Sequence, residues 1–170
     1  MKSLLLATLA MALAVQAPHA QDATQEKAAP CSSPECSQFD FWVGHWAVTA
    51  NNTQAGTNRT TKILGGCVLM EEWEGAGNFR GKSFNRFDSA TGKWEQFWVD
   101  NQGGALKLSG TYADGKMVMS GESVGPNGPV MDRITWHNKR DGDVRQLWEK
   151  STDGGKSWAV AFDGLYKRKG

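Results

Sequence analysis

The sequence lacks an excess of charge of either sign, because 19 Lys and Arg residues stand against 18 Asp and Glu residues among its 170 positions. This balance excludes the basic surface typical of nucleic-acid-binding proteins and the acidic tail of a solvated segment. Histidine is also scarce, with three in the chain, and no Gly-x-Ser-x-Gly elbow, His-Glu-x-x-His pair or phosphate-binding loop occurs. We therefore expect no nucleic-acid partner and assign no catalytic or metal-ligating residue.

Long apolar runs are absent except for one, from Leu4 to Val15, which follows Lys2. A helix of that length, at about 1.5 Å per residue, falls well short of the roughly 30 Å membrane core. A basic residue, an apolar stretch and a small residue at Ala20 are together typical of a secretory signal peptide. We expect residues 1–20 to be removed, leaving a periplasmic or secreted protein without a membrane span. Residues 21–37 are expected to be a flexible lead-in to a single domain at residues 38–170.

Cysteine is rare, and its three positions, Cys31, Cys36 and Cys67, all follow the expected signal peptide. Export makes a disulfide possible, but an odd number leaves one thiol unpaired within a monomer. One pairing joins Cys31 to Cys36 and leaves Cys67 as a buried thiol. The other joins Cys31 or Cys36 to Cys67 and fastens the lead-in to a strand. The sequence leaves both pairings open.

Helical periodicity is missing from residue 39 onward, and short aromatic and β-branched runs alternate with turn signals instead. The turn signals at residues 88–92, 113–116, 139–143 and 152–155 each combine Asp with a Gly, which is typical of tight hairpins between antiparallel strands. A wide open sheet would expose two edges, so we predict an up-and-down meander closed into a β-barrel of eight to ten strands. The expected strands lie near residues 39–49, 59–65, 67–74, 80–88, 93–101, 104–110, 116–122, 130–138, 143–151 and 157–168.

Polar and aromatic residues alternate on the same faces of several expected strands, as Gln96, Trp98 and Asp100 do. An unpaired Gln or Asp inside a filled core would cost roughly 1–3 kcal/mol, whereas a partly wet cavity would accept it. The pattern predicts a hollow barrel that binds a small hydrophobic or amphipathic molecule, with no cofactor. The expected ligand-binding residues are Glu72, Trp73, Asn85, Gln96, Trp98, Asp100, Arg133, Gln146, Trp148 and Tyr166.

Two motifs at the ends of the domain resemble a known superfamily. Gly44-x-Trp46 opens the first expected strand, and Tyr166-Lys-Arg168 closes the last one. This pairing is similar to that of the lipocalin and calycin barrels, which implies an indole at one end of the barrel with a cation stacked on it. Gly44, Trp46 and Arg168 are accordingly expected to be structural.

A second resemblance covers nearly the whole mature chain. The strings that carry it are Phe39-Asp-Phe-Trp-Val-Gly-His-Trp46, Ile63-Leu-Gly-Gly-Cys-Val-Leu-Met-Glu-Glu-Trp73, Trp94-Glu-Gln-Phe-Trp-Val-Asp100, Arg133-Ile-Thr-Trp136 and Val144-Arg-Gln-Leu-Trp-Glu-Lys-Ser151. They resemble the bacterial family known as domain of unknown function 1579. The resemblance implies a calycin-like barrel in an exported or cytosolic protein and carries no established reaction. His45 departs from that family, which more often has an acidic residue there.

Two alternatives to simple ligand binding remain open at this point. One is a calycin-type enzyme in which Glu72 or Asp100 acts as general acid or base near Arg133, with haem on His137 as a further variant. The other is an envelope structural or interaction protein whose barrel core is solid. All of these expectations depend on which alternate residues of each strand face inward, because a shift of one residue exchanges the inner and outer faces.

Overall fold

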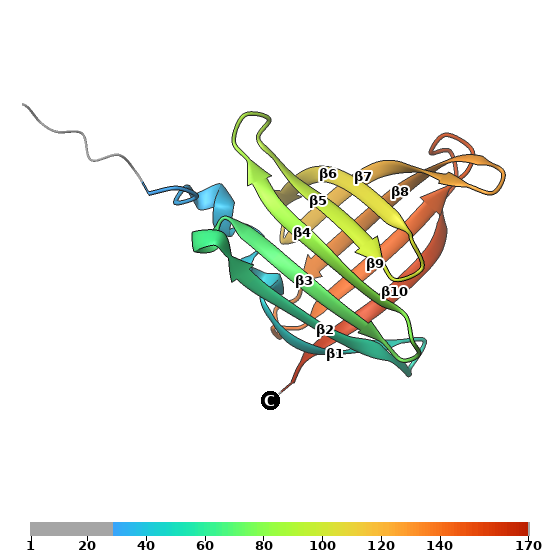
Figure 1. Ribbon diagram of the computed structural model, residues 1–170, viewed down its shortest axis with the longest axis horizontal. Helices are drawn as coiled ribbons and strands as arrows, with labels where there is room; N and C mark the ends of the chain where they lie inside the picture. Colours follow the sequence, from blue (N-terminus) through green and yellow to red (C-terminus); the bar gives the residue numbers. More distant parts are fainter. Residues whose placement is uncertain (1–28, 170) are drawn as a thin grey trace, which may run out of the picture.

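The computed structural model describes residues 29–169, so the expected signal peptide at residues 1–20 lies outside the described part. Ten antiparallel strands follow one another around a closed barrel, and β1 completes the circle by pairing with β10 (Figure 1). The predicted all-β meander and its closure are therefore confirmed. The strands are β1 (Gly44–Ala50), β2 (Thr53–Ile63), β3 (Val68–Gly75), β4 (Arg80–Asp88), β5 (Lys93–Asp100), β6 (Ala105–Ala113), β7 (Lys116–Gly125), β8 (Gly128–Asn138), β9 (Val144–Ser151) and β10 (Ala159–Arg168).

Three short 3-10 helices accompany the barrel: η1 (Pro34–Ser37), η2 (Asp40–Trp42) and η3 (Leu64–Gly66). Within residues 29–169, helices are too short to cross a membrane. Because every strand has a hydrogen-bonded neighbour on both sides, the sheet has no free edge. The barrel has two distinct ends. We call the end where β1 begins and β10 finishes the closed end, and the end with the β1–β2, β3–β4, β5–β6, β7–β8 and β9–β10 connections the open end.

The first predicted strand, residues 39–49, begins later than expected, at Gly44. The aromatic run before it forms η2, which folds in under the barrel rather than extending the sheet. The second predicted strand, residues 59–65, begins earlier, at Thr53, and ends at Ile63. Asn51 and Asn52 both adopt left-handed backbone angles, with φ of 49° and 59°. Two such residues make the tight turn that joins β1 to β2, and this lets the polar segment after them continue as strand.

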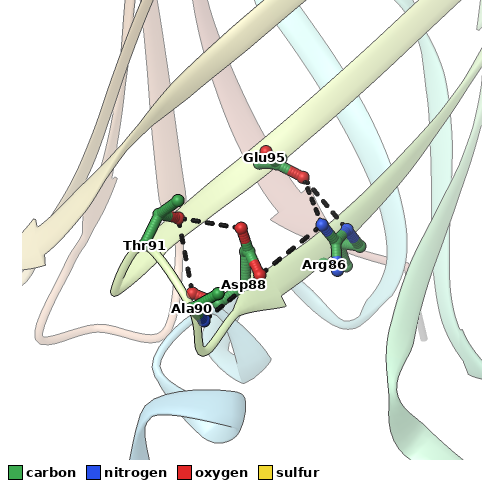
Figure 2. A network of polar contacts seen from close by, with 5 residues as sticks. All are labelled: Arg86, Asp88, Ala90, Thr91 and Glu95. Atoms are coloured by element: carbon green, nitrogen blue, oxygen red, sulfur yellow. Dashed lines mark hydrogen bonds and ion pairs between the residues drawn. The ribbon is translucent and has the colours of Figure 1, made fainter.

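The turn between β4 and β5 shows how side chains fix a hairpin (Figure 2). Asp88 Oδ1 accepts from the backbone N–H of Ala90 at 3.3 Å, and Asp88 Oδ2 accepts from Thr91 Oγ1 at 3.0 Å. Arg86 from β4 forms an ion pair with Glu95 of β5 at 2.9 Å, across the outer face. This exposed pair contributes little stability, so the turn itself sets the register of the two strands.

An aromatic plug fills the closed end, at the left of Figure 1. Phe39 and Trp42, on either side of the start of η2, stack with ring centroids 5.0 Å apart and are fully buried. Trp136 from β8 packs edge-on against Phe39 at 5.2 Å. Buried rings in such contact contribute area and roughly 0.5–1.5 kcal/mol for each aromatic pair. The closed end is therefore packed core.

The barrel wall around the plug contains Trp46 and Arg168, the indole and the cation that the two end motifs predict to stack. The Arg168 guanidinium lies 4.4 Å from the Trp46 ring centroid and donates to the carbonyl of Val43 at 3.2 Å. Trp46 Nε1 donates to the carbonyl of Trp42 at 3.1 Å, which ties the plug to β1. A Cβ on Gly44 would lie 2.6 Å from Arg168 Nη1, so only glycine leaves room for the stacked cation.

A disulfide joins Cys31 to Cys67, with the two Cα atoms 5.2 Å apart, and Cys36 is free. Of the two pairings that the sequence left open, the structure has the one that fastens the N-terminal segment to the barrel. Cys67 directly precedes β3, so the bond holds the residues before η1 against the closed end. Part of the expected lead-in, residues 21–37, is thus tied down by this bond and by the turn of η1.

Candidate ligand-binding cavity

The open end of the barrel contains a cavity of about 250 Å³. Half of the side chains that line it are aromatic: Trp73, Phe79, Trp98, Trp148, Phe162 and Tyr166. Aliphatic, amide and carboxyl side chains complete it: Leu106, Ile134, Ala161, Gln96, Gln146 and Glu71. A mostly apolar wall with a few polar groups is the usual composition of a small-molecule site.

Two glycines in the wall create the space for large rings. A Cβ on Gly81 of β4 would lie 2.0 Å from Cζ2 of Trp98, and a Cβ on Gly164 of β10 would lie 2.4 Å from Cε1 of Phe162. Each ring therefore rests directly on bare backbone. Any larger residue at Gly81 or Gly164 would push the ring away from the wall and into the lumen. The cavity depends on these two positions as much as on the rings themselves.

A chain of hydrogen-bonded polar side chains crosses the inner wall from β2 to β5, and Glu71 is at its centre. Glu71 Oε1 accepts from Asn58 Nδ2 at 2.6 Å, and its Oε2 accepts from Ser83 Oγ at 2.7 Å. Asn85 Nδ2 donates to Ser83 Oγ at 2.9 Å, and Gln96 Nε2 donates to Asn85 Oδ1 at 2.8 Å. All five side chains are buried, so the network fixes the direction in which each polar group points.

The Glu71 carboxyl group is strongly affected by its surroundings. Burial raises the pKa of Glu71 from 4.5 to about 7, although hydrogen bonds from Ser83 and Asn58 act in the opposite direction. Tyr166 faces it from β10 and donates its hydroxyl to Gln146 Oε1. The pKa of Tyr166 lies well above its ordinary value, first because the phenol is buried and second because Glu71 is near. At neutral pH the cavity thus contains a carboxyl group close to its midpoint and a neutral phenol.

Carboxylates hold two of the cavity's indoles by their N–H groups. Trp148 Nε1 donates to Asp132 Oδ1 at 2.8 Å, and Trp98 Nε1 donates to Asp100 Oδ2 at 3.4 Å. Desolvation raises the pKa of Asp100, but backbone N–H donors in the β5–β6 connection outweigh it and hold the pKa below its ordinary value. The Lys150 ammonium lies 4.5 Å from the Trp148 ring centroid and 3.9 Å from Asp132. The ring of Trp148 therefore already contacts a cation at the rim.

Eight of the ten predicted ligand-binding residues face the inside of the barrel. Asn85 lies below the cavity in the polar network, and Asp100 lies at the rim, where it anchors Trp98. The remaining six line the cavity directly: Trp73, Gln96, Trp98, Gln146, Trp148 and Tyr166.

The expected inward positions of Glu72 and Arg133 are wrong, because both side chains lie on the outer face. Glu72 forms an ion pair with Lys82 of β4 at 2.7 Å. Arg133 pairs with Glu149 at 3.0 Å and lies 4.0 Å from the Trp158 ring centroid. Each follows from strand alternation, since the neighbouring residues Glu71 and Asp132 are the buried ones.

Six residues line the cavity without being predicted from the sequence: Glu71, Phe79, Leu106, Ile134, Ala161 and Phe162. For Glu71 the signal was present, because Trp73 and Glu71 are two residues apart on one strand and must share a face. Choosing Trp73 as inward excluded Glu72 and required Glu71. Phe79 lies in the β3–β4 connection, and Phe162 follows a register shift between Val160 and Phe162, so alternation could not place either.

The residues of the enzymatic alternative are not brought together. Glu72 and Arg133 are outside the barrel, and Asp100 is engaged by the β5–β6 connection. His137 alternates with the inward Trp136 and lies on the outer face, where desolvation, Arg145 and Lys116 lower its pKa. It therefore cannot reach the cavity to hold haem there. Among residues 29–169, no three His, Cys, Asp or Glu side chains gather in a group that could hold a metal ion.

A larger depression of about 470 Å³ lies over β3 to β7, and its rim includes the exposed aromatic residues Phe84 and Phe97. Lys107 lies 5.5 Å from the Phe97 ring centroid, so charged side chains flank these rings. Of the buried network around Glu71, Gln96 lines this depression as well, whereas Glu71 itself lines the cavity inside the barrel and not the depression. We therefore place the candidate site inside the barrel and use Phe97 as a control for surface binding.

Comparison with protein-family models and with curated proteins finds no match for this chain. The arrangement can enclose a small apolar body between aromatic rings and offer it one carboxyl group, two amides and a phenol.

Proposed function

We propose that this protein binds a small amphipathic molecule inside the open end of its barrel. The observation that carries this proposal is the cavity of about 250 Å³ in which aromatic walls meet the buried Glu71 carboxyl group. Larger side chains could fill this space as they do at the closed end, and they would bury more apolar surface at about 25 cal/mol for each Å². A cavity maintained beside a fully packed closed end favours a binding role.

The size and chemistry of the cavity restrict the ligand. An apolar cavity of about 150 Å³ can hold benzene, so this larger one suits a molecule with one or two rings. Trp73, Trp98 and Trp148 offer flat apolar area at little entropic cost, because each has two rotatable side-chain bonds. Gln96 and Gln146 provide amide donors and acceptors that orient a polar group on the ligand.

We also propose that the protein is exported to the periplasm or secreted. Export is supported by the apolar segment from Leu4 to Val15 and by the Cys31–Cys67 disulfide, because disulfides persist in oxidising compartments. The five sequence segments that resemble domain of unknown function 1579 also lead us to propose that this chain is a calycin-like barrel of that family. N-terminal sequencing of the protein from a periplasmic extract tests export. A mature chain beginning near Gln21 is expected, and a chain retaining Met1 would contradict the proposal.

Titration with 2-naphthol, a neutral two-ring probe, tests the proposed site. Binding next to the cavity indoles is expected to quench tryptophan emission by energy transfer to the naphthol. Trp98→Ala removes one wall, and Gly81→Val drives the Trp98 ring into the lumen. Each substitution is expected to weaken binding about tenfold, which corresponds to about 1.4 kcal/mol.

Phe97→Ala is the matched control, because Phe97 is adjacent to Trp98 but faces solvent on the outside of the barrel. Its affinity for 2-naphthol is expected to equal that of the original protein. Loss of binding in Phe97→Ala with full binding in Trp98→Ala and Gly81→Val would move the site to the outer surface. Absence of any saturable quenching would contradict the proposed function altogether.

A further inference from the structure

Acidic groups predominate among the ionisable side chains in and directly behind the cavity wall. Among the residues that line it, Glu71 and Tyr166 are the ionisable ones, and none is Lys, Arg or His. Two further carboxylates, Asp100 and Asp132, stand behind Trp98 and Trp148 as hydrogen-bond acceptors. Two cations lie near the open end without lining the cavity: Lys150 is at the rim against Asp132, and the Arg80 guanidinium donates to the backbone carbonyls of the β3–β4 connection. An anionic head group inside the cavity would therefore meet a carboxyl group and no counter-charge.

Glu71 is held in place but retains capacity for one more partner. Its neighbours on the adjacent strands are neutral: Asn58 on β2 and Ser83 on β4 each donate one hydrogen bond to it. Tyr166 faces it from β10 and is also neutral. Each carboxylate oxygen can accept two hydrogen bonds, and each has one partner, so a donor from the cavity side can be added. A buried carboxylate without a cation is an arrangement that an ammonium group would complete.

The aromatic walls add to the same preference. The faces of indole and phenol rings carry negative electrostatic potential and attract cations within about 6 Å of the ring centroid. Trp148 already shows this contact with Lys150 at 4.5 Å. Trp73 and Tyr166, with ring centroids 6.4 Å apart, are both cavity-lining rings on the side of the barrel that holds Glu71. A cation placed against Glu71 would thus be surrounded by rings that favour it.

We propose that the cavity selects small molecules with one protonated amine on an aromatic or other apolar body, and that the Glu71 carboxylate is the counter-ion of that amine. This inference rests on the proposed function and specifies its ligand class. The apolar body occupies the space among Trp73, Trp98 and Trp148, and the ammonium group donates to Glu71. The amide oxygens of Gln96 and Gln146, which also line the cavity, can accept hydrogen bonds from its remaining N–H groups.

The proposal implies a characteristic dependence on pH. The hydrogen-bond partners of Glu71 on β2 and β4 are neutral, and Tyr166 on β10 is neutral at neutral pH. The charged groups at the open end are Asp100 and Asp132 behind the indoles, Lys150 beside Trp148, and Arg80 in contact with the β3–β4 connection. An incoming ammonium group stabilises the carboxylate form and so lowers the pKa of Glu71 from its value of about 7 in the empty protein. Amine binding therefore releases a proton below pH 7, and affinity rises with pH through this range.

Isothermal titration calorimetry with three probes of matched shape tests the inference: 2-phenylethylamine, 2-phenylethanol and phenylacetate. At pH 8 the amine is expected to bind about tenfold more tightly than the alcohol, and phenylacetate is expected to bind most weakly. Glu71→Gln keeps the shape of the side chain and one acceptor oxygen but removes the charge, so the amine and the alcohol should then bind within about threefold of each other. Glu72→Gln is the matched control, because Glu72 lies on the outer face; the preference should persist there.

The outcomes separate this inference from the proposed function. Equal affinity for amine and alcohol in the original protein, or an amine preference that survives Glu71→Gln, overturns the amine proposal and leaves a ligand-binding barrel. Binding by none of the three probes, together with no binding of 2-naphthol, overturns the proposed function itself. If Glu71→Gln fails to fold, the affinities of the original protein are measured at two pH values instead. Amine affinity should fall at least about fivefold from pH 8 to pH 5.5, while alcohol affinity should stay constant. A flat amine profile overturns the proposal.

Discussion

The two ends of this barrel use the same residue type for opposite purposes. At the closed end, Trp42, Trp46 and Trp136 are fully buried and pack against other rings. At the open end, Trp98 and Trp148 are partly exposed and are held at the wall by carboxylates. The difference comes from their surroundings, since η2 fills one end of the lumen, whereas two glycines allow rings to lie flat at the other. Tryptophan content alone thus says nothing about whether a barrel is hollow.

The largest expected effect comes from removing the plug. Trp42→Ala should lower the free energy of unfolding by about 3–5 kcal/mol, because Trp42 is fully buried among rings. Trp98→Ala should cost less than half as much, since that ring is partly exposed and the cavity beside it is already present. Urea denaturation of both variants measures the difference. Equal losses would show that the open end is packed as firmly as the closed one, contrary to the comparison.

The second effect concerns the dependence of stability on pH at the open end. The folded protein raises the pKa of Glu71 from 4.5 to about 7, so between these values it retains a proton that the unfolded chain releases. Burial of Glu71 costs nothing below pH 4.5, where the carboxyl group is protonated in both states; the destabilisation develops between pH 4.5 and 7 and is complete above 7. The free energy of unfolding should therefore fall by about 3 kcal/mol across this window.

Comparison of the original protein with Glu71→Gln in urea at pH 4 and pH 9 isolates this contribution from that of other groups. The variant should lack the fall and should be the more stable of the two at pH 9. Glu72→Gln serves as the control, because the Glu72 carboxylate is exposed and its pKa is lowered by Lys82. A fall that is unchanged in Glu71→Gln would mean that other groups cause it and that the Glu71 carboxyl group is not the source of the pH dependence.

The smallest effect is expected at the outside of the closed end. Arg168→Met removes the cation from the Trp46 ring but keeps an apolar chain of similar length, so it should cost about 0.5–1 kcal/mol. Affinity for 2-naphthol should remain unchanged, because the two sites are at opposite ends. Thermal denaturation and the naphthol titration together measure this. A change in affinity would reveal coupling between the ends.

Much of the fold could be predicted from the sequence, because the turns and the alternation are local signals. β4 occupies residues 80–88, as expected from its alternating pattern and the Asp88 turn. The plug could not be predicted, since the apolar run around Trp42 fits a buried strand as well as an inward-folded turn. The site was predicted only in part, because the residues that face the cavity depend on which alternate positions of each strand point inward. A choice of Glu72 together with Trp73 is incompatible with any one face of a strand, and the structure resolves it in favour of Glu71.

Closure of the barrel through β1 and β10 has a practical consequence. Trp46 pairs with Arg168, and the backbone N–H of Lys169 donates to the carbonyl of His45 at 2.8 Å, so the last described residues leave the barrel at the plugged end. The Cys31–Cys67 bond brings the N-terminal segment to the same place. If the protein is attached to a surface or a fusion partner after Lys169, the open end of the barrel will consequently point away from the attachment and stay accessible to ligands. Immobilised protein should therefore report binding as faithfully as protein free in solution.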